Sequence, residues 1–145
     1  MATAQISLQT QASCDAPEIQ LVFWFDGEQI HERPLTQEPQ QFRYEFPDLD
    51  DQEHCFEIEM RGKLPEHTRV DPDGNILSDV TAEICSVALD DIELGHMFSK
   101  QAVYHHDHNG TTDAVQDGFF GVMGCNGRVT LRFHSPVYLW LLENM

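Results

Sequence analysis

Apolar and polar residues alternate along most of this chain, and this two-residue period constrains its fold more than any other feature. Phe56, Ile58 and Met60 alternate with Glu57 and Glu59. Because successive side chains of a β-strand point to opposite faces, the pattern predicts strands with one buried face. Similar runs occupy residues 6–10, 19–25, 42–46, 80–89, 119–123 and 129–133. With Gly, Pro and Asp clusters between them, about eight short strands are expected in a single all-β domain over residues 1–145, an antiparallel β-sandwich or jelly roll.

The clearest local signal is a β-hairpin near the start of the chain. Residues 19–25 are rich in aromatic and branched side chains, and residues 29–33 follow them after Asp26 and Gly27. Asp-Gly is favoured in two-residue turns because both positions need positive φ angles. We therefore predict a tight turn at Asp26 and Gly27.

The alternation breaks between Ile84 and Cys85. Apolar residues occupy even positions over residues 80–84 and odd positions over residues 85–89. A one-residue slip moves side chains to the other face of a strand, so the break predicts a β-bulge.

Two short segments allow helical structure. Residues 89–100 predict one helical turn, whereas residues 137–142 fit either a closing helix or a final strand. The sequence has no internal repeat, low-complexity tract or linker, which agrees with one domain.

The charge of the chain is strongly negative. Eight Lys and Arg residues stand against 25 Asp and Glu residues, which gives a formal net charge of −17. A field of this sign repels phosphate groups, so we expect no nucleic acid and no membrane among the partners. Divalent cations, basic protein surfaces and neutral ligands such as sugars stay open. The longest apolar stretches, residues 21–25 and 137–142, are far too short to span a membrane.

The four cysteines, Cys14, Cys55, Cys85 and Cys125, are widely spaced and form no Cys-x-x-Cys pair. A disulfide framework needs closer spacing, a smaller domain or a secretory signal, and the first residues lack the features of such a signal. We therefore expect four free thiols in a protein that folds in a reducing cytoplasm.

Residues 71–79 contain the strongest candidate metal site. Four residues carry the hard oxygen atoms that calcium prefers. They are Asp71, Asp73, Asn75 and Asp79. Gly74 is fourth in this loop rather than sixth as in an EF-hand, and no glutamate closes the loop. A simple Pro-Asp-Gly turn is therefore the favoured alternative.

A histidine-rich segment occupies residues 104–110. In a strand, His106 and His108 share one face, with His105 and Asp107 on the other. Two imidazoles can begin a zinc or nickel site, but such a site needs three or four ligands. A polar loop that leads into an Asn-Gly turn is therefore the favoured interpretation.

Motifs of catalysis are absent from the sequence. There is no Gly-x-Ser-x-Gly elbow, no Gly-rich phosphate loop and no His-Glu-x-x-His pair. Carboxylate pairs arise by chance in so acidic a chain, so they identify no glycosidase. We expect a protein that binds and does not catalyse.

Aromatic and apolar residues provide the candidate partner-binding surface. At least one of Phe23, Trp24 and Phe25 must face away from the core of a regular strand. An outward Trp24 suits a sugar ring or a protein partner. The C-terminal segment is unusually apolar, so it either completes the core or docks on another subunit. Its candidate contact residues are Tyr138, Leu139, Trp140 and Leu142.

Two resemblances are carried by these residues. Residues 91–95, 102–110, 123–127 and 138–145 look like small uncharacterised virion-associated proteins of T4-like marine cyanophages. Residues 24–28, 60–63 and 71–75 are similar in layout to calcium-dependent carbohydrate-binding β-sandwiches.

The first resemblance implies a non-enzymatic structural or accessory component of a tailed-phage virion, such as a decoration, tail, neck or fibre-associated domain. Such a protein is assembled in the host bacterial cytoplasm and binds other virion proteins or copies of itself, with its acidic surface toward a basic patch. The second implies a calcium-dependent carbohydrate-binding module that uses residues 71–75 and an aromatic such as Trp24. We take the virion component as the leading hypothesis and the carbohydrate-binding module as the alternative.

Overall fold

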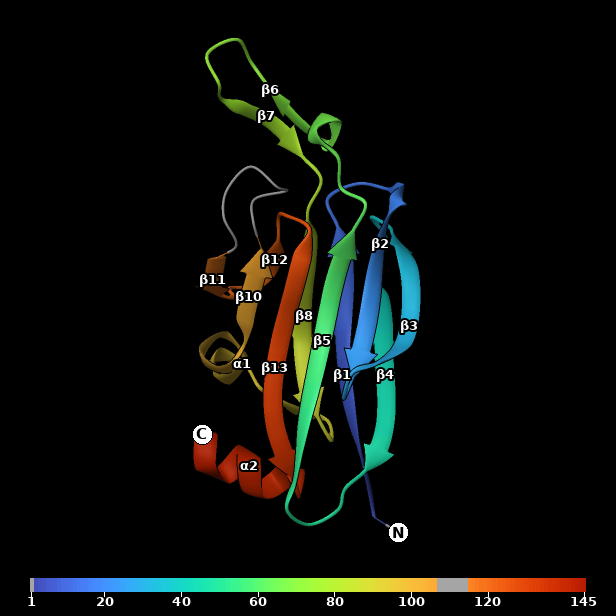
Figure 1. Cartoon of the computed structure of the whole chain (residues 1–145), viewed down its shortest axis with the longest axis vertical. Coiled ribbons are helices and arrows are strands. Elements are labelled where there is room, and N and C mark those ends of the chain that lie inside the picture. Colours follow the sequence, from blue (N-terminus) through green and yellow to red (C-terminus); the bar gives the residue numbers. More distant parts are fainter. Residues whose placement is uncertain (1, 107–114) are drawn as a thin grey trace.

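The computed structural model describes residues 2–106 and 115–145, and most of its strands form two packed antiparallel sheets (Figure 1). The first sheet has the strand order β12-β8-β1-β4, with β9 also paired to β8. Its strands are β1 (Thr3–Ala12), β4 (Gln40–Pro47), β8 (Ala82–Leu89), β9 (Ile92–Glu93) and β12 (Val122–Met123). The second sheet has the order β11-β10-β13-β5-β2-β3. Its strands are β2 (Ala16–Phe25), β3 (Glu28–Leu35), β5 (Gln52–Arg61), β10 (Val103–His106), β11 (Val115–Gly118) and β13 (Gly127–Ser135).

The predicted all-β sandwich is confirmed, and aromatic side chains fill much of the space between the sheets. The inward face of β5 carries Phe56, Ile58 and Met60, which are all buried. Phe23 of the second sheet stacks on Phe42 of the first, with ring centroids 4.2 Å apart. The apolar residues of the alternating pattern therefore face this core, and the polar residues between them face solvent.

The predicted hairpin is confirmed between β2 and β3. Asp26 (φ 50°) and Gly27 (φ 84°) both have positive φ angles, which a two-residue turn between right-twisted strands requires. The Asp26 carboxylate also accepts a 2.8 Å hydrogen bond from the backbone N–H of Cys55. The turn is thereby tied to β5.

The predicted bulge is confirmed in β8. Between the pairs Ser7–Ala88 and Gln9–Cys85, the register of β8 against β1 shifts. Ser86 takes a positive φ of 55° and lies in the extra length of β8. Apolar residues at even positions before the bulge and odd positions after it consequently reach the same core.

The strand predicted at residues 119–123 is shorter than expected. Only Val122 and Met123 pair, as β12, because Gly121 has a φ of 106° and bends the backbone before them. Phe119 is fully buried, whereas its neighbour Phe120 is 85% exposed. The bend therefore leaves an aromatic ring on the surface.

A two-stranded ribbon that the alternation does not reveal projects beyond both sheets (Figure 1). It consists of β6 (Thr68–Val70) and β7 (Ile76–Asp79), preceded by a 3-10 turn at Pro65–His67. Val70, Ile76 and Leu77 are all largely exposed. Because this ribbon has no buried face, its sequence lacks the alternation that marks the other strands.

Two α-helices complete the regular structure of the described residues. The helical turn predicted within residues 89–100 is confirmed as α1 (His96–Gln101), and the C-terminal segment forms a helix, α2 (Val137–Asn144), rather than a strand. Among residues 2–106 and 115–145, no helix is both long enough and apolar enough to cross a membrane.

The apolar residues of α2 divide between core and surface. Trp140 is buried and packs edge-on against Phe133 of β13, with ring centroids 6.1 Å apart. Trp140 therefore belongs to the core, and the prediction that it contacts a partner is wrong. Tyr138, Leu139 and Leu142 lie on the opposite side of the helix and are exposed.

Substitution of these two kinds of residue should have unequal effects. Trp140→Ala is expected to lower the free energy of unfolding by about 3–5 kcal/mol, because it leaves a cavity between α2 and β13. Leu142→Ala should change it by less than about 0.5 kcal/mol, because that side chain is exposed. Urea unfolding followed by circular dichroism measures both values, and similar losses in the two variants would contradict the assignment.

Candidate functional site

A gap in the edge of the first sheet forms the candidate site. β8 pairs with β12 only through residues 82–83 and with β9 only through residues 88–89. Neither of these short strands pairs with residues 84–87, the segment that contains the bulge. Bulges are frequent at sheet edges and beside functional sites because they end regular pairing.

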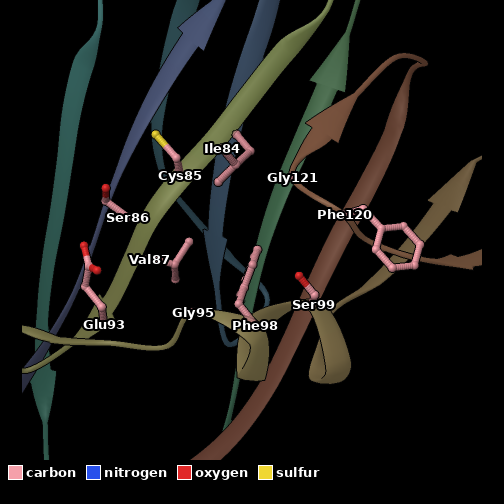
Figure 2. Close-up of a pocket in the computed structure, with 10 residues that line it drawn as sticks. All are labelled: Ile84, Cys85, Ser86, Val87, Glu93, Gly95, Phe98, Ser99, Phe120 and Gly121. Carbon is pink, nitrogen blue, oxygen red and sulfur yellow. The ribbon is translucent and has the colours of Figure 1, made fainter.

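Two backbone hydrogen bonds close the ends of this gap. The Ile84 N–H donates to the Gly121 carbonyl over 2.8 Å, and the Leu94 N–H donates to the Val87 carbonyl over 2.9 Å. Between them lies a pocket of about 190 Å³, bounded by β8, β9, α1 and the segment before β12 (Figure 2). We call it the edge pocket.

The edge pocket has an apolar base and one exposed ring at its rim. Phe98 and Val87 are buried at the base, and Phe98 packs edge-on against Phe119 at 5.8 Å. Phe120 lies at the rim and is almost fully exposed. A Cβ atom at Gly118 would lie 3.3 Å from Cζ of Phe120, so this ring leans on a glycine backbone. Its position is thus supported while most of its surface meets solvent.

Three polar side chains also line the edge pocket. Ser86 and Glu93 lie on one side of the opening, and Ser99 lies on the other side, near Phe120 (Figure 2). One carboxylate and two hydroxyl groups supply hydrogen-bond acceptors and donors. Together with an aromatic ring, they suit a small ligand that has an apolar face and several hydroxyl groups.

Trp24 faces outward from the second sheet, but its ring is engaged by neighbouring side chains. Its Nε1–H donates to Glu59 Oε1 over 2.9 Å. The guanidinium carbons of Arg128 and Arg61 lie 4.5 and 5.7 Å from its ring centroid, within cation–π range. Trp24 therefore offers a ligand less ring surface than Phe120 does.

Glu59 joins the members of this cluster. Its Oε2 accepts a 2.8 Å hydrogen bond from Arg61 Nε, and its Oε1 lies 3.2 Å from an Arg128 nitrogen. Burial raises the pKa of Glu59, but the hydrogen bonds from Arg61 and Trp24 outweigh burial, so the pKa lies below its ordinary value. With Glu57, whose Oε1 lies 3.5 Å from an Arg128 nitrogen, the cluster pairs two carboxylates with two guanidinium groups.

The candidate calcium residues do not converge on one point. Asp71, Asp73 and Asn75 lie at the tip of the β6–β7 ribbon, whereas Asp79 lies at its base opposite Thr68. Asp71 Oδ1 accepts 2.9 Å hydrogen bonds from the backbone N–H groups of Asp73 and Asn75. The hydrogen bonds from Asn75 lower the pKa of Asp71. The carboxylate thus stabilises the turn, as expected if this loop is a simple Pro-Asp-Gly turn.

Asp79 is bound to a buried lysine. The side chain of Lys63 is 1% exposed, and its Nζ lies 2.6 Å from Asp79 Oδ1 and 2.5 Å from the Gly124 carbonyl. The Thr68 hydroxyl donates to the same Asp79 oxygen over 2.7 Å. The Lys63 ammonium group therefore occupies one carboxylate oxygen of Asp79, and it joins the ribbon to the loop before β13.

The histidine-rich segment lies only partly within the described residues. His105 and His106 belong to β10, whereas Asp107 and His108 fall outside the described ranges. His106 Nε2 lies 2.8 Å from Asp117 Oδ2 on β11. In the part of the chain that the structure describes, no three His, Cys, Asp or Glu side chains are grouped as a metal site requires.

One constellation that sequence reasoning missed resembles a catalytic triad. His54 Nδ1 lies 2.8 Å from Asp26 Oδ2, and His54 Nε2 lies 3.3 Å from Ser135 Oγ. Ser135 is 1% exposed, and its hydroxyl donates to the Leu49 carbonyl over 2.5 Å. Because a hydroxyl has a single hydrogen, His54 does not receive it as the base of a triad does. The grouping is structural and ties β13 to the loop between β4 and β5.

Comparisons with known proteins inform the fold. No family model and no curated protein sequence matches this chain. A solved structure of vCBM60 has a TM-score of 0.53 and 9% sequence identity to this chain, and the alignment covers 88% of this chain and 89% of that chain. That structure is described with a circular permutation that links two families of calcium-dependent carbohydrate binding modules. A structure of vCBM60 in complex with galactobiose has a TM-score of 0.50 and 10% identity over 88% of this chain and 96% of that chain. At this identity the likeness establishes a shared β-sandwich fold.

Calcium binding through the ribbon residues can be tested directly. Asp71 and Asp79 already accept hydrogen bonds from the protein, and they lie at opposite ends of the ribbon. We expect Asp71→Asn to leave the difference in melting temperature between calcium and chelator unchanged, since only an ion bound to the native state through Asp71 would make the two proteins differ. A calcium-dependent rise that Asp71→Asn abolishes would contradict this expectation.

Proposed function

We propose that this protein is a carbohydrate-binding module that holds a sugar ring in the edge pocket. The observation that carries the proposal is the 85% exposed ring of Phe120, at the rim of a pocket that also contains Glu93 and Ser99. A sugar presents a face of C–H groups that stacks on an aromatic ring, and hydroxyl groups that bond to carboxylates and hydroxyls. The β-sandwich shared with vCBM60 supports the same proposal.

Binding without catalysis is part of this proposal. Of the described residues, one carboxylate, Glu93, lines the edge pocket, whereas glycoside hydrolysis generally uses two that flank the scissile bond. Among the described residues, the only hydroxyl within hydrogen-bond distance of His54 is that of Ser135, which is buried. A cavity of about 370 Å³ beside His54 and Asp26 is not lined by Ser135.

Replacement of Phe120 tests the proposal. Phe120→Ala is expected to weaken binding of neutral oligosaccharides, with galactobiose among the probes, by about tenfold or more, because a central stacking contact is lost. The free energy of unfolding should change by less than about 0.5 kcal/mol, because the side chain is exposed. Isothermal titration calorimetry and urea unfolding measure the two quantities.

Val122→Ala provides the matched control, since Val122 is also exposed and lies two residues along the chain. Its affinity for the same sugars should match that of the unaltered protein. Unchanged binding in Phe120→Ala, or an equal loss in both variants, would contradict the placement of the site.

A second proposal is the virion component that the cyanophage resemblance implies, and exposed apolar surface fits the protein–protein contacts that it requires. α2 exposes Tyr138, Leu139 and Leu142, and the β6–β7 ribbon exposes Ile76 and Leu77. Such surfaces suit contacts with other virion proteins or copies of this chain, and the charge of −17 suits a basic partner. In this proposal the protein resides in the virion after assembly in the host cytoplasm.

Light scattering tests the self-assembly that this second proposal includes. A mass above that of one chain is expected, and Leu142→Ser should reduce it to one chain without disturbing Trp140 in the core. A protein that stays monomeric and does not co-sediment with phage particles would contradict the second proposal and leave the first unaffected.

A further inference from the structure

We infer that the edge pocket selects its sugar by charge. It accepts a neutral or amine-bearing residue at the end of a glycan chain and excludes residues that carry a carboxylate or a sulfate. The inference rests on the proposed carbohydrate binding and adds the class of sugar that the site takes.

The charged groups around the edge pocket are mainly acidic. Among the described residues, its lining contains one carboxylate, Glu93, and no Lys, Arg or His. Glu83 and the turn at residues 90–91 add exposed carboxylates nearby along the chain, whereas α1 contributes the exposed Lys100 and His96 outside the lining. An anionic sugar would approach a protein of net charge −17 and meet no cation in the pocket to offset the repulsion.

An amine, in contrast, gains interactions at either side of the pocket. An ammonium group beside Glu93 forms a charge-assisted hydrogen bond with the carboxylate. An ammonium group over Phe120 is attracted by the electron-rich face of the ring. Glu93 and Phe120 lie on opposite sides of the opening (Figure 2), so the two attractions act at separate places in the edge pocket.

The dimensions of the edge pocket limit the ligand to a single ring. Residues 84–87 extend over at most about 10 Å, and the hydrogen bonds of Ile84 and Leu94 close both ends. The volume of about 190 Å³ lies below the roughly 300–1,000 Å³ of pockets for drug-sized ligands. Further sugar residues can leave the pocket only toward solvent, which favours a chain terminus over an internal residue.

Sugars that differ in one substituent test this selection. The probes are the methyl glycosides of galactose, galactosamine and galacturonic acid, together with their gluco counterparts, titrated by ligand-observed NMR. We expect the amine to bind about two- to fivefold more tightly than the neutral sugar and the uronate to bind more weakly by a similar factor, the range for one exposed charge pair. Both differences should shrink at about 0.5 M salt because exposed charges are screened.

Two variants separate the pocket charge from the overall charge. Glu93→Gln keeps the size of the side chain and should reduce the differences between the three affinities, because the contribution of the pocket carboxylate is lost while those of Phe120 and the overall charge stay. Glu28→Gln makes the same change in net charge at an exposed position of β3, outside the edge pocket, and should preserve the order. An equal reduction in Glu28→Gln, or undiminished differences in Glu93→Gln, would overturn the role of Glu93.

The outcomes also separate this inference from the function on which it rests. Uronates that bind as tightly as neutral sugars would overturn selection by charge and leave carbohydrate binding intact. If none of the sugars binds to protein that circular dichroism shows to be folded, both proposals fail. The expected order of affinities, dependent on Glu93 and on salt, supports both.

Discussion

The stacking of Phe23 on Phe42 is the contact on which the rest of this structure depends. Phe23 belongs to the second sheet and Phe42 to the first, and their rings lie 4.2 Å apart and within 7° of parallel. A sheet buries one face only if another layer covers it, and these rings fill the space between the two layers. Phe25 and its partner across the strands, Phe56, extend the aromatic layer from Phe23 toward the β2–β3 turn. Every loop that carries a candidate site is positioned by the strands that this layer holds together.

The edge pocket is a consequence of that core. Ile84 and Val87 are both buried, and in a regular strand residues three positions apart point to opposite faces. The bulge at Ser86 resolves the conflict, because the extra residue turns both side chains inward. The same distortion interrupts pairing along the outer edge of β8, so neither β9 nor β12 extends over it. A requirement of packing thereby opens a pocket at the edge of the sheet.

Much of the fold can be predicted from the sequence because the core imposes a period that is visible locally. The hairpin turn at Asp26 and the bulge at Ser86 follow from neighbouring residues alone. The pairing of Lys63 with Asp79, and the approach of Arg128 to Trp24, join residues far apart in the chain, so no local pattern contains them. The exposed β6–β7 ribbon escapes prediction for a related reason, since no buried face shapes its sequence.

Contacts between residues far apart in the chain also decide which polar groups are available for function. Ser135 and Asp79 lie in groupings that resemble a catalytic triad and a metal site, yet their oxygen atoms already bond to other parts of the protein. Buried polar groups of this kind stabilise a fold because each is satisfied within it. Glu93 and Phe120 differ because their side chains face solvent at the mouth of a pocket. A ligand gains most where the fold leaves hydrogen-bonding and stacking capacity unused, and this places the candidate site at the edge pocket.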